Sequence, residues 1–265
     1  MDLSVVIPCY NEIESIPTLE ERLIDVLVKL SDSEKIGQIP TKNIEVLLVD
    51  DGSQDGTYDA LKSYFDAVQY ENIEVRLVKH PTNLGVGAAL RTGFSLAQGN
   101  IVVTSDSDGT YSFAEIPQLL THLTADVSMV TASPYHPKGG IENVPGHRIF
   151  LSKGASLLYR ILVKPEIHTY TALFRAYRRS MLNEVPFESS GFLSGTELMV
   201  NGMLMGHEVA EYPAILQSRI HGVSKARLFR IIKEHLAYQW RITKYRLGFS
   251  SIHEQYASVR RYQKA

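Results

Sequence analysis

The sequence predicts an α/β fold in which helices flank a mostly parallel central sheet. Short apolar runs alternate with amphipathic stretches along residues 1–131, as they do in consecutive βαβ units. The run at 44–49 is almost continuously apolar, which is typical of a strand buried on both faces of a parallel sheet. This alternation predicts βαβ units with right-handed crossovers, and therefore one parallel sheet covered by helices.

The elements are expected in the following order along the chain. Apolar and β-branched runs predict strands at 4–7, 44–49, 74–78, 101–104 and 127–131. Apolar residues at helical spacing predict helices at 13–30, 57–68, 86–97 and 113–123. The second half is less regular, with helices expected at 148–162, 193–205 and 225–245, and strands at 170–177 and 208–212. Segments with polar residues, Pro and Gly predict loops at 31–42, 134–145 and 218–224.

The composition is that of an ordinary globular protein. The 265 residues are 44% hydrophobic and 21% charged, which excludes wholesale disorder and collagen-like repeats. The one cysteine, Cys9, excludes a disulfide framework and a four-cysteine zinc site, and it fits a reducing compartment. Residues 1–11 do not resemble a signal peptide, and no window has the roughly 18 uninterrupted apolar residues of a membrane span. We therefore expect a cytoplasmic protein whose contact with a membrane is at most peripheral.

The net charge of −2 conceals an uneven distribution. Residues 1–110 carry 8 Lys and Arg against 18 Asp and Glu, whereas residues 111–265 carry 19 against 11. An acidic half joined to a basic half argues against plain nucleic-acid binding, which needs a dominant basic face. The asymmetry suits a site where carboxylates hold a cation and basic groups meet an anion, although a chance distribution of surface charge would look the same.

Polar and acidic residues follow three of the expected strands, at 8–12, 50–57 and 106–108. Each cluster alone could be a turn or a helix cap, because Asp, Gly and Ser are ordinary residues there. In an open parallel sheet, however, ligands bind beyond the carboxyl ends of the strands. Three clusters at the same end of the sheet therefore predict a ligand site.

The sequence Asp106-Ser107-Asp108 is the sharpest of these signals. Two carboxylates one residue apart at a strand end can both reach one hard cation, and Mg²⁺ or Mn²⁺ prefers such oxygen ligands. The chain has no P-loop motif, and no dinucleotide-binding glycine motif follows the first strand. The glycines in 83–87 open a helix, where they could receive an anion or form a tight turn.

The motifs at 5–12, 49–57, 83–87 and 106–108, in this order and spacing, resemble those of family 2 glycosyltransferases. The segments 175–179 and 219–225 are similar to the polyprenyl-phosphate branch of that family, typified by dolichol-phosphate mannose synthase. The resemblance extends over roughly residues 3–235. It implies a GT-A (Rossmann-like) fold and an inverting, Mg²⁺- or Mn²⁺-dependent transfer of mannose or glucose. The implied donor is a nucleotide-diphosphate sugar, GDP-mannose or UDP-glucose, and the implied acceptor is dolichyl or undecaprenyl phosphate.

The resemblance also implies roles for residues at matching positions. The implied metal ligands are Asp106 and Asp108, and the implied acceptor region contains Arg148 and Arg175. The implied nucleotide-sugar site consists of Pro8, Tyr10, Glu12, Leu48, Asp50, Asp106, Ser107, Arg219, Ser224 and Lys225.

A mechanism can be argued for these residues from charge. A metal on Asp106 and Asp108, together with the cation of Arg219, would stabilise the negative charge that grows on the leaving diphosphate. A lipid phosphate is already an anion and needs binding cations more than a general base, whereas a hydroxyl acceptor needs a base. Glu197 is a candidate for that base or for an acceptor-orienting group, and it could equally be an acidic residue at a helix start.

Three positions depart from the family pattern. Pro134 stands where the family has an arginine, Thr169 where it has an acidic residue, and Thr110 where the synthases commonly have glutamine. These departures leave two alternatives open besides transfer to a polyprenyl phosphate. One is transfer to a soluble or polysaccharide hydroxyl, and the other is a catalytically weak protein that binds nucleotide sugars.

The C-terminal segment is basic. We expect a glycosyltransferase domain at 1–224, with a helix and tail at 225–265 packed on it. Residues 225–246 contain seven Lys and Arg against the single acid Glu234, and an apolar stripe is formed by Leu228, Ile231, Ile232, Leu236 and Trp240. The stripe could simply pack on the sheet. Alternatively, the helix could also lie against an anionic bilayer, or a separate membrane partner could recruit the protein.

Overall fold

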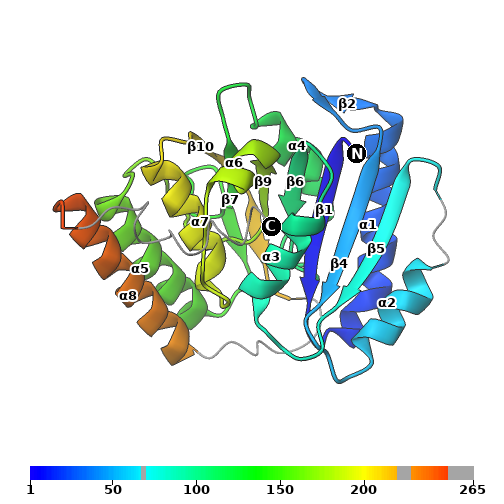
Figure 1. Cartoon of the computed structure of the whole chain (residues 1–265), viewed down its shortest axis with the longest axis horizontal. Coiled ribbons are helices and arrows are strands. Elements are labelled where there is room, and N and C mark those ends of the chain that lie inside the picture. The colour runs from blue at the N-terminus through cyan, green and yellow to red at the C-terminus, as the bar shows by residue number, and fades with distance from the viewer. Residues whose placement is uncertain (67–69, 220–227, 250–265) are drawn as a thin grey trace.

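The computed structural model describes residues 1–66, 70–219 and 228–249, and its centre is a seven-stranded sheet (Figure 1). The strand order across the sheet is β10-β7-β9-β6-β1-β4-β5. In chain order the strands are β1 (Leu3–Cys9), β4 (Ile44–Asp50), β5 (Ile73–Lys79), β6 (Ile101–Thr104), β7 (Met129–Ser133), β9 (Arg175–Arg178) and β10 (Val209–Pro213). All the strands predicted for the first half are therefore confirmed, with ends shifted by one or two residues.

The sheet is mostly parallel, as predicted. Strand β1 pairs in parallel with β4 and β6, β4 with β5, and β7 with β10. Only β9 runs antiparallel to its neighbours β6 and β7. The carboxyl ends of β1, β4 and β6 therefore meet at one edge, where the sequence predicts the ligand site.

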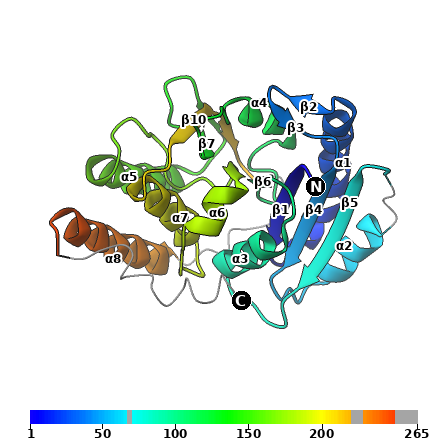
Figure 2. The ribbon, with the colours of Figure 1, turned by 45° about the horizontal axis from the view of Figure 1, so that its top comes forward.

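Helices cover both faces of the sheet (Figures 1 and 2). One core contains side chains of α1 (Ile16–Asp32), α2 (Thr57–Phe65) and α4 (Ile116–Thr121). The other contains side chains of α3 (Val86–Leu96), α6 (Arg179–Glu184) and α7 (Leu193–Leu204). Alternation along β1 feeds both cores, because Val5 and Ile7 join the first and Val6 joins the second.

Two predicted loops contain short strands. Within 31–42 the chain forms a hairpin of β2 (Lys35–Ile36) and β3 (Ile39–Pro40). Within 134–145, β8 (Gly140–Glu142) pairs in parallel with β11 (Ile215–Gln217). Strands of two or three residues are too short to leave a period-two pattern, so the sequence did not reveal them.

The helices α5 (Gly146–Leu162) and α8 (Leu228–Arg246) lie side by side at the end of the molecule remote from α2 (Figures 1 and 2). Helix α8 packs against both α5 and α7. In the parts of the chain that the structure describes, no helix has the length and apolar character needed to cross a bilayer. The proposed domain boundary at residue 224 lies outside the described residues and stays a prediction.

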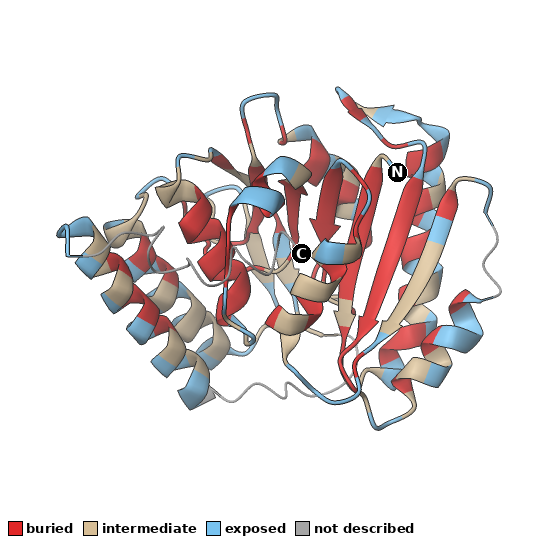
Figure 3. Ribbon diagram, viewed as in Figure 1, coloured by how far each residue is buried: buried red, intermediate tan, exposed pale blue. Residues whose placement is uncertain are grey.

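Helix α8 does not pack on the domain through the apolar stripe predicted for it. Its buried residues are His235, Tyr238, Gln239 and Ile242. The members of the predicted apolar stripe at 232, 236 and 240 are exposed instead (Figure 3). The expectation that this stripe packs on the sheet is therefore wrong, because α8 docks through a different face.

Candidate active site

A cavity of about 700 Å³ opens at the carboxyl edge of the sheet. Segments that follow β1, β5 and β6 form part of its wall, with Arg219 and residues 190–192. Helix α8 contributes Arg230, Ile231 and Glu234 to the same wall. Of the implied nucleotide-sugar residues, those that line the cavity are Pro8, Tyr10, Glu12, Asp106, Ser107 and Arg219. The implied metal ligand Asp108 lines it as well.

Arg219 connects two acidic side chains in this cavity. Its Nε lies 2.8 Å from Oδ2 of Asp108, and its Nη1 lies 3.4 Å from Oε1 of Glu12. Oδ1 of Asp108 accepts hydrogen bonds from the backbone N–H and the hydroxyl of Thr110. The threonine that departs from the family pattern thus orients the second aspartate of the pair.

Asp106 is electrostatically linked to the same group. Burial raises the pKa of its carboxyl above the ordinary value, and the nearby charge of Asp108 raises it further. Arg219 and Arg148 act in the opposite direction. Arg148, from the first turn of α5, is therefore close enough to influence this carboxylate from the predicted acceptor side.

The chemistry of this pair fits a divalent cation. The Asp106 carboxylate, whose charge is penalised by burial and by neighbouring Asp108, gains from a bound hard cation, and oxygen ligands suit Mg²⁺ or Mn²⁺. Within the described ranges, no three His, Cys, Asp or Glu side chains are arranged to hold a metal. Asp106 and Asp108 are thus the residues that would hold the ion, with coordination positions left for phosphate oxygens.

Asp50 lies beneath the cavity rather than in its wall. It is fully buried at the end of β4, where its Oδ2 accepts a hydrogen bond from the N–H of Ser53. No donor among the described residues reaches its Oδ1. Burial raises the pKa of Cys9, which does line the cavity, and the negative charges of Glu12 and Asp50 raise it further. Asp50 therefore keeps one unsatisfied acceptor close to the predicted nucleotide pocket.

Asp51 fixes a neighbouring part of the wall. Its carboxylate accepts hydrogen bonds from the N–H groups of Leu84 (3.0 Å) and Gly85 (2.7 Å). His80 Nδ1 lies 2.7 Å from the same carboxylate. These N–H groups are already engaged, so the structure favours the tight turn over the anion site at 83–87. Sequence reasoning did not give Asp51 this role, although its place directly after a strand was a signal.

Three implied site residues lie away from the cavity. Leu48 belongs to the core on the α1 side of the sheet. Its side chain points to the same face of β4 as that of Val46, because residues two positions apart on a strand share a face. Arg175 is fully buried, and its guanidinium donates hydrogen bonds to the carbonyls of Tyr170 and Gly195 and to the hydroxyl of Thr131. Arg175 therefore ties internal segments together, and it is not among the residues that line the cavity.

Glu197, the third, supports the wall from behind. Its buried carboxylate accepts hydrogen bonds from the N–H groups of Ser189 (2.8 Å) and Glu188 (3.2 Å). Arg91 of α3 donates to the carbonyls of the same two residues and to the hydroxyl of Ser190. This geometry makes Glu197 a positioning residue for the loop that lines the cavity.

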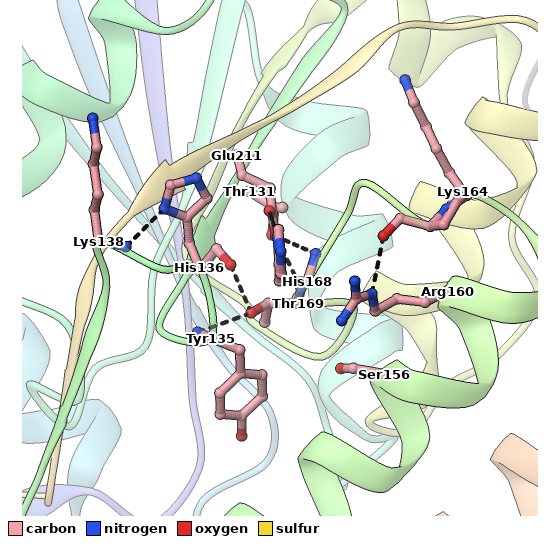
Figure 4. A network of polar contacts seen from close by, with 12 residues as sticks. Thr131, Tyr135, His136, Lys138, Ser156, Arg160, Lys164, His168, Thr169 and Glu211 are labelled. Atoms are coloured by element: carbon pink, nitrogen blue, oxygen red, sulfur yellow. Dashed lines mark hydrogen bonds and ion pairs between the residues drawn. The ribbon is translucent and has the colours of Figure 1, made fainter.

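The other two departures from the family pattern lie in a satisfied polar network (Figure 4). The N–H groups of His168 and Thr169 donate to Oε1 of Glu211, at 2.8 and 2.9 Å, and His168 Nδ1 lies 2.7 Å from Oε2. The Thr169 hydroxyl is 2.8 Å from that of Ser133, next to the buried Pro134. Glu211 of β10 thus brings an acidic group to the region where residue 169 lacks one. Ser224 and Lys225 lie outside the described residues.

Comparison with known proteins identifies the family. The sequence profile of glycosyl transferase family 2 matches residues 4–185. The chain is 32% identical to a polyprenol monophosphomannose synthase from Mycolicibacterium smegmatis over 83% of its length and 79% of that protein. It is 30% identical to an undecaprenyl-phosphate mannosyltransferase from Micrococcus luteus, over 94% of its length and all of that protein.

Solved structures agree at the level of the fold. Glucosyl-3-phosphoglycerate synthase from Mycobacterium tuberculosis, in complex with Mn²⁺ and UDP, superposes with a TM-score of 0.64 at 19% identity. The match covers 95% of this chain and 81% of that one. The chain therefore belongs to glycosyltransferase family 2, and it is a glycosyltransferase with a GT-A fold.

Proposed function

We propose that the protein is an inverting, metal-dependent transferase that moves a hexose from a nucleotide-diphosphate sugar to a polyprenyl phosphate. The observation that carries the proposal is the placement of Asp106, Asp108 and Arg219 together in one cavity. Two relatives at 30–32% identity bear the names of polyprenyl-phosphate mannosyltransferases, which favours mannose over glucose and GDP-mannose as the donor.

On the donor side, the strand-end residues Pro8 and Tyr10 form the wall for the nucleotide, with Glu12 beside the phosphates. Asp106 and Asp108 would hold a divalent ion, which would supply positive charge to the donor diphosphate when bound. Arg219 is the cation that the chain itself offers to the leaving group. Its ion pairs with Asp108 and Glu12 keep the guanidinium at the carboxylate cluster, so it needs little reorganisation to donate to a phosphate bound there.

The engagement of Glu197 supports a phosphate acceptor over a hydroxyl acceptor. A hydroxyl needs a base within hydrogen-bond reach, whereas the Glu197 carboxylate is buried and holds the backbone of Ser189. A lipid phosphate carries its own negative charge and can attack without losing a proton. Arg148 and the basic residues of α5 and α8 suit the binding of such an anion. Because this acceptor is a lipid, the enzyme would work peripherally at the cytoplasmic face of a membrane.

The proposal can be tested with a matrix of two donors and two acceptors. The protein is incubated with Mn²⁺ and either GDP-mannose or UDP-glucose, together with farnesyl phosphate or methyl mannoside. Mass spectrometry of the products is expected to show hexosyl farnesyl phosphate with GDP-mannose. A glycosylated methyl mannoside as the main product would replace the lipid acceptor with a hydroxyl acceptor. Absence of product with every combination would favour a nucleotide-sugar-binding protein.

A further inference from the structure

Helix α8 buries a mixed face of His235, Tyr238, Gln239 and Ile242 and exposes an apolar stripe. The face that packs against the domain contains His235 and Gln239, and His235 Nδ1 lies 2.9 Å from the hydroxyl of Tyr159 on α5. By contrast Phe229 is 92% exposed and Trp240 is 61% exposed. Together with Ile232 and Leu236 they follow helical spacing along one stripe. A helix that simply covers a domain core would not leave such an apolar stripe exposed.

Helix α5 repeats this arrangement at the same end of the molecule. Its buried residues are Ser156 and Tyr159, whereas Phe150 is 77% exposed and Ile161 is 72% exposed. Leu157 is also exposed, on the same helical face as Phe150 and Ile161. Single exposed apolar residues are normal, but aromatic and aliphatic stripes on two packed helices mark an interaction surface.

The positive charge of α5 and α8 indicates what kind of partner binds their exposed faces. Helix α8 carries five Lys and Arg and the single acidic residue Glu234, and α5 carries three Lys and Arg and no acidic residue. On α8, the exposed Lys233 and Lys244 lie beside the apolar stripe. A second copy of the chain bound face to face would bring like charges together, which is unfavourable. An anionic bilayer satisfies both the apolar stripes and the basic residues.

The same helix leads from this surface to the cavity. Arg230, Ile231 and Glu234 of α8 line the cavity, and the apolar stripe occupies another side of the helix. A bilayer in contact with the stripe would therefore lie next to the residues that line the donor site. This link rests on the proposed function, since it gives a lipid phosphate a short path to Asp106 and Arg219.

We propose that the exposed faces of α5 and α8, here called the docking surface, bind an anionic lipid bilayer. Aromatic and aliphatic side chains of the stripes enter the interface between headgroups and acyl chains, and the flanking lysines meet lipid phosphates. The docking surface includes Phe150, Leu157 and Ile161 of α5 and Phe229, Leu236 and Trp240 of α8.

Trp240 is the only tryptophan in the chain, so its fluorescence reports on the docking surface directly. Adding vesicles of phosphatidylcholine mixed with phosphatidylglycerol should shift its emission to shorter wavelength, and high salt should reverse the shift. Vesicles of phosphatidylcholine alone should give a much smaller shift. Emission that stays unchanged with the anionic vesicles at low salt would overturn the proposal.

Matched variants separate the docking surface from the rest of the molecule. The double variants Phe229→Ser with Leu236→Ser, and Phe150→Ser with Ile161→Ser, should each lower the co-sedimented fraction, corresponding to an affinity loss of about tenfold or more. Lys233→Gln with Lys244→Gln should also weaken binding. The exposed residues Tyr64 and Lys62 lie on α2 at the other end of the molecule, so Tyr64→Ser with Lys62→Gln should leave binding unchanged. Equal losses in the α2 control would contradict the assignment.

Two further measurements keep the outcomes distinct. Transfer to farnesyl phosphate in solution should be unaffected by the two apolar double variants, because neither of them changes a cavity residue or a basic residue. Vesicle binding without any transfer would retain the docking surface and reject the proposed function. Transfer without vesicle binding would retain the proposed function and reject the docking surface. A blue shift that grows with protein concentration without vesicles, together with dimers in light scattering, would overturn the proposal in favour of self-association.

Discussion

The guanidinium of Arg219 and the carboxylate of Asp108 form an ion pair, with 2.8 Å between Nε and Oδ2. This pair joins the segment after β11 to the loop after β6, and Glu12 from the end of β1 completes it. Positive and negative groups are thus held together in the cavity, as the proposed reaction requires. The predictions below follow from this arrangement and from the packing around it.

Asp108→Asn should reduce glycosyl transfer by about a hundredfold or more, because it removes one of two carboxylates that can hold the metal. The fold should remain intact, since the residue lies in the cavity wall and not in an apolar core. Transfer rates and thermal unfolding of both proteins check this. The exposed Asp59 on α2 provides a matched control, and Asp59→Asn should behave like the wild type. Wild-type turnover in Asp108→Asn would refute the metal assignment.

Arg219→Gln should separate metal binding from transfer. The variant removes a cation that neutralises Asp108 and Glu12, so Mn²⁺ should bind at least as tightly as in the wild type in the absence of donor. Transfer should fall about a hundredfold, because the leaving diphosphate loses its guanidinium partner. Calorimetric titration with Mn²⁺ and steady-state kinetics measure the two effects. A parallel loss of metal binding and transfer would show that Arg219 acts only by maintaining the site.

Glu197 should behave as a positioning residue. Glu197→Gln keeps an oxygen that can accept from the N–H of Ser189, so most of kcat should survive. Glu197→Ala removes the acceptor, and we expect a higher KM for the donor and a stability loss of about 1–3 kcal/mol from the unsatisfied buried N–H groups. If Glu197 were a general base, both variants would lose kcat by about a hundredfold or more. Comparison of the two variants therefore decides between the roles.

His235 should make the protein sensitive to acid. Its burial against α5 lowers the pKa of the imidazole from about 6.5 to about 4. The unfolded chain therefore takes up this proton first as the pH falls, and stability is lost between about pH 6.5 and pH 4. The full loss amounts to about 3 kcal/mol. Urea unfolding across this range measures it, and His235→Gln should flatten the pH dependence. The exposed His147 on α5 serves as control, because His147→Gln should keep the wild-type slope.

The sequence was sufficient to predict the sheet and the acidic end of the site. Continuous apolar runs identified β1, β4 and β6, and the polar residues after them line the cavity as strand ends in a parallel sheet should. The antiparallel direction of β9 could not be predicted, because the residue pattern within a strand does not record its direction. The network around Glu211 was also hidden, since its partners at 168 and 169 are distant in the sequence.

The positions that differ from the sequence-based expectations share one physical cause, which is that a residue type does not specify the face it occupies. Arg175 and Glu197 are charged, but each is buried because backbone groups satisfy it. Leu48 belongs to a strand that ends at the site, but its side chain packs into the core on the α1 side of the sheet. On α8 the hydrogen bond between His235 and Tyr159 allows a polar residue to be buried beside Tyr238 and Ile242, and the apolar stripe alone did not predict this face.

The most direct test of the account is the fate of the sugar in the presence and absence of a divalent ion. Radiolabelled GDP-mannose is incubated with the protein and farnesyl phosphate, with either Mn²⁺ or EDTA, and the product is extracted into organic solvent. The account predicts label in the organic phase with Mn²⁺ and almost none with EDTA. Label that stays in the aqueous phase with Mn²⁺, or that enters the organic phase equally with EDTA, would contradict it.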